Sequence, residues 1–167
     1  MIIVEHAYSI NFIDPLDIFV GFDYTSSCCE DFGYLFLAKP FTEMTPEELK
    51  ALSPEDSWYN DEYGPQLSES MSMFESEAAA QEALKNYIFD PLYCANENDG
   101  GDGGVVIFKL IGADAPVYLH LYNHHNGYYA HGFDMKIGKP GSHEDHTLLV
   151  QDKEYSTFGA EVHSGSL

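Results

Sequence analysis

Histidine and tyrosine alternate along residues 117–133, and these are the side chains best placed to do chemistry. Asn126-Gly127 predicts a two-residue type I′ turn between two antiparallel strands. Side chains alternate across a strand, so the turn places one set on a single sheet face. That set is Tyr118, His120, Tyr122, His124, Tyr129, His131 and Phe133. Cross-strand diagonals bring His131 within reach of His120 and His124, so we expect three imidazoles on a half-exposed face.

This His and Tyr face has two interpretations. Three imidazoles can hold a transition metal, with further ligands from a distant segment; these would be Cys28, Cys29, Glu30 and Asp31. The chain has no Cys-x-x-Cys, His-Glu-x-x-His or calcium-loop spacing, and the Gly-rich loop at 96–104 lacks the bidentate Glu of a calcium site. Such a face more often binds a partner or packs as half-core residues. We therefore expect no metal and no cofactor.

Nucleophilic catalysis finds little support in the chain. The acidic residues at 23, 30 and 31 raise the pKa of the Cys28 and Cys29 thiols, so we expect both to be unreactive and unlinked. No Gly-x-Ser-x-Gly elbow or phosphate-binding glycine loop is present. Carboxylates are so numerous that choosing an acid and base pair would be arbitrary. We expect a protein that is not an enzyme.

The charge balance restricts the class of partner. The chain has 28 Asp and Glu, 7 Lys and no Arg, and its net charge is −21. Arg supplies the planar fork that grips phosphate and carboxylate, so its absence argues against sites for nucleotides, nucleic acids and anionic metabolites. The same field repels anionic membranes and attracts cationic proteins. A basic protein is the expected partner.

The acidic residues concentrate between Glu43 and Asp102. Duplex DNA carries about one charge per 1.7 Å of axis, and carboxylates along helices and loops can approximate that spacing. We therefore place the partner-binding surface in this middle segment, on residues Glu47, Glu48, Glu55, Asp56, Asp61 and Glu62. The partner class that fits this surface is a nucleic-acid-binding enzyme, displaced from its DNA.

Local patterns predict the elements that position these residues. Apolar and aromatic runs predict strands within 2–13, 18–24, 34–38, 105–111, 117–124, 128–137 and 147–150. A flexible acidic loop is expected at 94–104. Thr45 followed by Pro46 and two Glu predicts a short helix through Leu52. Ser53-Pro54 predicts another helical turn, and an Ala-rich run predicts a helix from about Ser76 to Phe89.

These elements predict a single α+β domain over residues 1–167. Its mostly antiparallel sheet draws on both halves of the chain, with a helical middle segment at about residues 44–90. Twelve Tyr and 11 Phe are enough to fill an ordinary core. No stretch approaches the roughly 20 apolar residues of a membrane span, and the N-terminus lacks a signal-peptide pattern. Three cysteines suggest reduced thiols and a cytoplasmic protein.

Two short stretches carry a resemblance. Ser27-Cys28-Cys29-Glu30-Asp31 comes early, and Asn126-Gly127-Tyr128-Tyr129 comes late after the run at 106–110. With these, residues 17–38 and 104–137 resemble a family of small uncharacterised phage and bacterial proteins, a domain of unknown function. The chain departs from that family in its longer helical middle and in His124, His125 and His131. The resemblance implies a β-rich fold and a phage setting and assigns no activity. In composition alone, the chain is also similar to small, very acidic phage proteins that inhibit host nucleic-acid enzymes by imitating DNA.

Three functional hypotheses follow from the sequence. The first is a non-enzymatic, phage-type inhibitor or adaptor that binds a basic protein of defence or transcription in the host cytoplasm. The second is a small metal-binding or ligand-binding protein that uses the His and Tyr face. The third is a structural or virion-associated protein for which acidity provides solubility.

Overall fold

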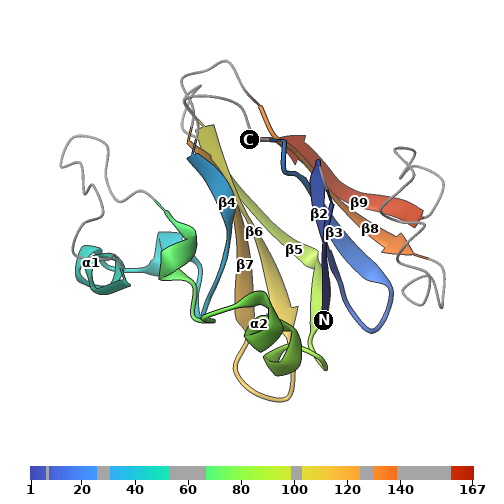
Figure 1. Cartoon of the computed structure of the whole chain (residues 1–167), viewed down its shortest axis with the longest axis horizontal. Coiled ribbons are helices and arrows are strands. Elements are labelled where there is room, and N and C mark those ends of the chain that lie inside the picture. Colours follow the sequence, from blue (N-terminus) through green and yellow to red (C-terminus); the bar gives the residue numbers. More distant parts are fainter. Residues whose placement is uncertain (7, 26–30, 53–66, 99–102, 125–129, 139–158) are drawn as a thin grey trace.

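Two antiparallel sheets face each other in this protein (Figure 1). The computed structural model describes residues 1–6, 8–25, 31–52, 67–98, 103–124, 130–138 and 159–167. In that part of the chain, one sheet has the strand order β1 (Ile2–His6), β2 (Ser9–Ile13), β3 (Ile18–Asp23), β8 (Gly132–Gly138) and β9 (Gly159–Ser166). The other has the order β4 (Asp31–Leu37), β7 (Val117–His124), β6 (Gly103–Ile111) and β5 (Ile88–Asn98).

Both halves of the chain contribute to each sheet. β3 pairs with β8 in the first, and β4 pairs with β7 in the second. The predicted mostly antiparallel strand pairing, combined with a few short helices, is thus confirmed. However, the strands divide into two sheets because their apolar residues fill a space between layers.

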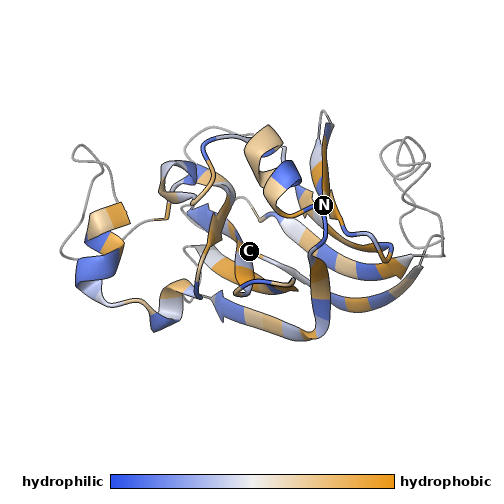
Figure 2. Cartoon of the chain, turned by 90° about the horizontal axis from the view of Figure 1, so that it is seen from below, coloured by the Kyte–Doolittle hydropathy of each residue, from blue (hydrophilic) through white to orange (hydrophobic). Residues whose placement is uncertain are grey.

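Aromatic rings from both sheets meet in the core between them. The Phe12 and Phe36 ring centroids are 6.0 Å apart, and those of Phe108 and Phe133 are also 6.0 Å apart. All four side chains are buried. Figure 2 shows the alternation of hydrophobic and hydrophilic residues along the strands that this packing requires.

Helical elements cover the outer face of the four-stranded sheet. They are η1 (Phe41–Glu43), α1 (Pro46–Leu52) and η2 (Glu69–Met71). Leu49 of α1 and Met71 of η2 are buried in one cluster with Leu35 and Ile107 of the sheet. The four-stranded sheet is therefore buried on both faces.

The segment 67–83 also protects two sheet edges. The Met73 N–H donates to the Phe36 carbonyl oxygen of β4 at 2.9 Å. In α2 (Glu77–Ala83), the Gln81 side chain accepts a bond from the Ile3 N–H of β1 at 3.3 Å. A covered edge cannot pair with another chain. Within the described ranges, no helix has the length and apolar character needed to cross a bilayer.

The predicted hairpin between residues 117–124 and 128–137 is wrong. β7 pairs with β4 on one side and β6 on the other, and β8 pairs with β3 and β9. Both edges of β7 are therefore occupied by strands of its own sheet. The proposed turn at Asn126-Gly127 lies outside the described residues.

The predicted helix at 76–89 is shorter than expected, whereas the helix through Leu52 is confirmed. The Ser76 side chain caps α2 by accepting the Ala79 N–H at 3.3 Å, and the helix ends at Ala83. Phe89 belongs to β5, because its ring packs in the core against Phe108. Tertiary burial here overrides the helical propensity of the Ala-rich run.

The predicted loop at 94–104 is also partly wrong. Residues 94–98 belong to β5, and β6 begins at Gly103. Asp90-Pro91 lies inside β5, where the pairing register shifts between Phe89 and Cys94, and such bulges tolerate proline. β9 was not expected from its weak pattern. The predicted strand at 147–150 and the helical turn after Ser53 lie outside the described residues.

Candidate functional site

The predicted His and Tyr face exists on β7 but is covered by other side chains. Tyr118, His120, Tyr122 and His124 alternate along the strand on its outer face. His120 is fully buried and Tyr122 is 2% exposed. The side chains of Leu35, Ile107 and Leu49 belong to the same outer-face cluster as Tyr122. The half-exposed surface expected from alternation is therefore packed core at its centre, whereas Tyr118 and His124 at the two ends of the face are half-buried.

His120 bonds through both ring nitrogens. Its Nε2 accepts the Phe41 N–H of η1 at 3.1 Å, and its Nδ1 lies 3.2 Å from the Tyr118 carbonyl oxygen. These partners fit a neutral ring that carries its proton on Nδ1. Desolvation by burial lowers the pKa of His120 to about 4, opposed by the bond to the Tyr118 carbonyl. The ring therefore joins η1 to the sheet.

His131 does not join His120 and His124, so that part of the prediction is wrong. Its ring stacks on Phe32 with centroids 4.2 Å apart, and its Nδ1 lies 2.7 Å from the Asp23 carbonyl oxygen. Phe32 belongs to the core between the sheets, on the opposite face of β4 from Leu35. The predicted pairing failed because β7 and β8 lie in different sheets. Tyr129 lies outside the described residues.

A metal centre finds no geometric support in the part of the chain described. No three His, Cys, Asp or Glu residues gather there in an arrangement that could hold an ion. Cys28, Cys29 and Glu30, which the metal hypothesis used, lie outside that part. Cys94 is a half-buried free thiol whose pKa is raised by burial.

The predicted partner-binding surface is described only at its start. Glu47 and Glu48 are exposed in the first turn of α1, where acids favour the helix dipole. Glu55, Asp56, Asp61 and Glu62 lie outside the described residues. Glu47 is therefore available to a partner, whereas Glu48 already has an internal role.

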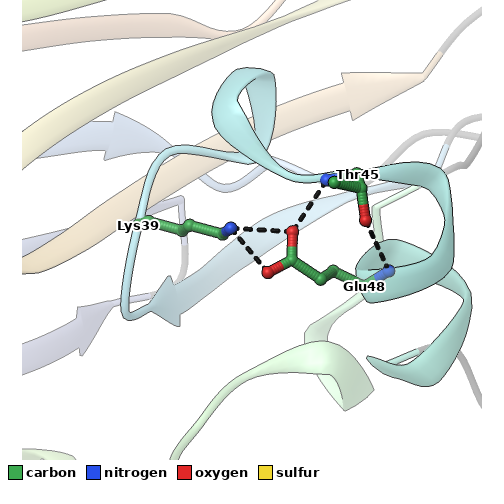
Figure 3. A network of polar contacts seen from close by, with 3 residues as sticks. All are labelled: Lys39, Thr45 and Glu48. Atoms are coloured by element: carbon green, nitrogen blue, oxygen red, sulfur yellow. Dashed lines mark hydrogen bonds and ion pairs between the residues drawn. The ribbon is translucent and has the colours of Figure 1, made fainter.

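Glu48 and Thr45 form a reciprocal cap at the start of α1 (Figure 3). The Thr45 N–H donates to Glu48 Oε2 at 2.8 Å, and the Glu48 N–H donates to Thr45 Oγ at 3.3 Å. Lys39 Nζ also lies 2.6 Å from Glu48 Oε1. The Lys39 ammonium, then the Thr45 N–H, lower the pKa of the Glu48 carboxyl group. These contacts attach α1 to the end of β4.

We expect Thr45→Ala to loosen α1 without unfolding the sheets. Loss of an N-cap side chain costs about 1 kcal/mol, so the free energy of local opening should fall by about that amount. Amide hydrogen exchange across α1 measures it. Thr42→Ala, a change at a nearby exposed residue, is the control and should leave exchange in α1 unchanged. Equal exchange in the two variants would contradict the capping role.

A pocket that sequence reasoning missed lies between the two sheets and segment 69–80. Its volume is about 280 Å³, and it is lined by Glu5, Tyr24, Tyr34, Phe36, Glu69, Ser72, Phe74, Glu75, Ser76, Glu77 and Ala80. These residues come from β1, the end of β3, β4, η2, α2 and the connection between η2 and α2. No local sequence signal predicts a site assembled from such distant segments.

Two tyrosines of the pocket bond to carboxylates of the covering segment. The Tyr24 hydroxyl donates to Glu69 Oε1 at 2.9 Å, and the Tyr34 hydroxyl donates to Glu77 Oε1 at 2.8 Å. Burial first, and then the carboxylate partners, raise the pKa of both tyrosines far above 10.0. Both hydroxyls therefore remain donors at neutral pH.

Gly33 gives the Glu69 carboxylate room at the sheet edge. A Cβ added at Gly33 would lie 2.8 Å from Glu69 Oε1 and 2.9 Å from the Tyr122 hydroxyl oxygen. Glu69 thus lies against the β4 backbone, between Tyr24 and Tyr122. The Tyr24 hydroxyl orients the carboxylate and the β4 backbone leaves it room, which favours a preformed site.

Comparisons with known proteins add no relative to this geometry. No family model, curated protein or solved structure matches the chain. The resemblance at residues 17–38 and 104–137 stays a prediction. Function must therefore be argued from the charge and the pocket.

Proposed function

We propose that this protein is a non-enzymatic acidic inhibitor or adaptor that binds a basic, nucleic-acid-binding protein of a bacterial host. The observation that carries the proposal is the net charge of −21 with no arginine in the chain. A surface of this sign attracts basic proteins and repels nucleic acid and anionic membranes. A phage setting, the host cytoplasm and a single domain belong to the same proposal.

Internal ion pairing supports a role for this charge outside the molecule. Among the described residues, the ion pairs join Lys39 to Glu48, Lys85 to Glu82 and Lys136 to Asp134. Only the last is largely buried. Surface ion pairs contribute little to stability. Most carboxylates of the described chain therefore remain available for a cationic partner.

DNA mimicry is the form of inhibition that best fits this charge. An acidic protein that occupies a DNA-binding groove must compete with duplex DNA, whose phosphates make the same electrostatic contacts. The His and Tyr face does not support an alternative ligand site, because its central residues His120 and Tyr122 are buried. No observation favours a virion-associated role.

Competition with DNA tests the proposal. Purified restriction endonuclease, CRISPR effector complex and RNA polymerase, each bound to labelled duplex DNA, are titrated with the protein. We expect at least one to release its DNA, and its affinity for the protein to fall at least about tenfold between 0.1 M and 0.5 M salt. Binding that leaves DNA in place, or that is indifferent to salt, would contradict mimicry.

Charge reversal locates the contact. Glu47→Lys, Glu55→Lys and Asp56→Lys together should slow association with that partner by about tenfold, while leaving Glu48 to cap α1. The matched control reverses three exposed acids that lie outside the middle segment in sequence, Asp31, Asp114 and Glu161. Surface plasmon resonance gives both rates. Equal slowing by both variants would show that total charge, rather than the middle segment, governs binding.

A further inference from the structure

We propose that the pocket between segment 69–80 and the two sheets binds an arginine side chain of a protein partner. The inference rests on the proposed function, because it names the group by which a basic partner would be recognised. The pocket is separate from the predicted surface on α1. It is the concave site that the described residues form around Tyr24 and Tyr34.

The walls of the pocket combine negative charge with aromatic rings. Four carboxylates line it, from Glu5, Glu69, Glu75 and Glu77. None of the ion pairs formed among the described residues involves these four. A concave site with four like charges favours a cationic occupant.

Aromatic side chains form the deeper part of the pocket. Phe36 is 1% exposed, and its ring centroid lies 5.6 Å from that of Phe74. The Tyr34 ring contacts Phe12 of the core at 4.9 Å, and the Tyr24 ring contacts Phe32 at 5.1 Å. These contacts hold the rings in place. Fixed aromatic walls suit a cation that can also pack by its faces.

The tyrosine hydroxyls orient the carboxylates and leave most of their acceptor positions unoccupied. Each carboxylate has about four acceptor positions, and Tyr24 and Tyr34 each use one on Glu69 and Glu77. The remaining acceptors can receive N–H groups from a ligand. Two oriented carboxylates on one site match a group with several donors in a plane.

A guanidinium group fits these walls better than other cations do. It is planar, has five donors and stacks on aromatic rings, whereas an ammonium is a compact, strongly hydrated charge. A metal ion is not favoured, because the described residues contain no group of three ligands in metal-holding geometry. The volume of about 280 Å³ suits one side chain rather than a cofactor. The chain contains no arginine, so the side chain must come from a partner.

NMR titration of the isotope-labelled full chain tests the inference. The probe is the capped tripeptide acetyl-Gly-Arg-Gly-amide, and the control replaces arginine by citrulline, its neutral isostere. We expect the arginine peptide to shift signals of Tyr24, Tyr34 and Ser76, and the citrulline peptide to bind at least about tenfold more weakly. The lysine tripeptide should bind more weakly than the arginine peptide. Agmatine, a free guanidinium, tests the alternative of a small-molecule ligand.

Two neutralised pairs locate the effect. Glu5→Gln with Glu75→Gln removes pocket charge without touching the two tyrosine bonds, and should weaken the arginine peptide about tenfold. The control, Glu43→Gln with Glu47→Gln, changes net charge equally on the η1 and α1 segment and should leave peptide affinity within about twofold. Glu69→Gln keeps an acceptor for Tyr24 and should also weaken binding.

The outcomes separate this inference from the proposed function. Shifts spread evenly over acidic residues, equal binding of the citrulline peptide, or binding of agmatine without the capped peptide would each overturn the pocket assignment. If the peptide leaves the pocket signals unchanged while a basic protein still binds with salt dependence, the inference fails and the proposed function stands. If the peptide binds in the pocket but none of the basic proteins is bound, the proposed function fails instead.

Discussion

Replacing Asp14 by alanine is expected to lower the free energy of unfolding by about 3 kcal/mol, with urea denaturation as the measurement. The Asp14 side chain is 1% exposed. Its Oδ1 accepts the N–H groups of Leu16 and Ile18 at 2.8 and 2.9 Å, and its Oδ2 accepts the Phe89 N–H at 2.8 Å. Alanine would leave these three donors without their acceptor.

The size of this effect is a balance of two terms. An unsatisfied buried donor costs about 1–3 kcal/mol, so the two buried donors, Ile18 and Phe89, cost several, and the part-buried Leu16 N–H adds less. Burial opposes this, because it raises the pKa of Asp14 and penalises the charged form against the three N–H bonds that favour it. Removing the carboxylate relieves that penalty, which is why we expect about 3 kcal/mol rather than the full sum. If the free energy of unfolding of the Asp14→Ala variant lay within about 1 kcal/mol of the parent's, other acceptors would have replaced the carboxylate.

Asp90 is a matched control for Asp14. Both begin the tripeptide Asp-Pro-Leu, and Asp90 Oδ1 likewise accepts the N–H two residues later, from Leu92 at 3.0 Å. Asp90 is only half-buried and its bond lies at the surface. Asp90→Ala should therefore cost less than about 1 kcal/mol. If both variants lost a similar free energy of unfolding, the local turn, rather than the bond to Phe89, would account for the stabilising effect of Asp14.

This pair shows what the sequence can and cannot predict. Asp14-Pro15 lies between the predicted strands at 2–13 and 18–24 and does separate β2 from β3, because that signal is local. The same dipeptide at Asp90-Pro91 directly follows the helix predicted from about Ser76 to Phe89, but it lies in a strand bulge. What distinguishes the two is Phe89, whose ring packs in the core and whose N–H meets Asp14 across 75 residues. Contacts at that separation leave no local pattern.

The strand β7 makes the same point for the site. Its alternation was read correctly, so the side chains of His120 and Tyr122 do lie on one face of the strand. The strands that pair with β7 are not those predicted, because Asn126-Gly127 indicates a turn but does not determine which strands pair. The apolar residues on one face and the aromatic ones on the other are typical of a central strand buried on both sides. That signal could have predicted that β7 is a central strand, but not that its neighbours are β4 and β6.

The pocket was beyond sequence reasoning for a related reason. Glu5, Tyr24 and Glu69 have no spacing in common and come together only through the two sheets and η2. Composition predicts a cationic partner, and the fold adds a pocket lined by four carboxylates that composition does not reveal. The charge was therefore predictable, and its geometry was not.

Acidification should destabilise the protein through His120. The folded-state pKa of about 4 lies below the ordinary value of 6.5, so the unfolded chain binds the proton more readily between these values. The contribution of the neutral ring is complete above pH 6.5 and is lost as the pH falls toward 4. We expect about 2 kcal/mol to be lost between pH 7.5 and pH 5.0, of about 3 kcal/mol in total. Urea denaturation at the two pH values measures the loss.

A His120→Gln variant isolates this effect from the many carboxylates of the chain. Lower pH also weakens repulsion among acids, which stabilises the fold, but that change is common to parent and variant. Between pH 7.5 and pH 5.0, the free energy of unfolding of the parent should therefore fall by about 2 kcal/mol more than that of the variant. Should the variant fail to fold, the ring signal of His120 in the parent decides, since it should not titrate above pH 5. A ring that titrates near pH 6.5 would mean that water reaches it and that the bond from Phe41 does not hold η1 on the sheet.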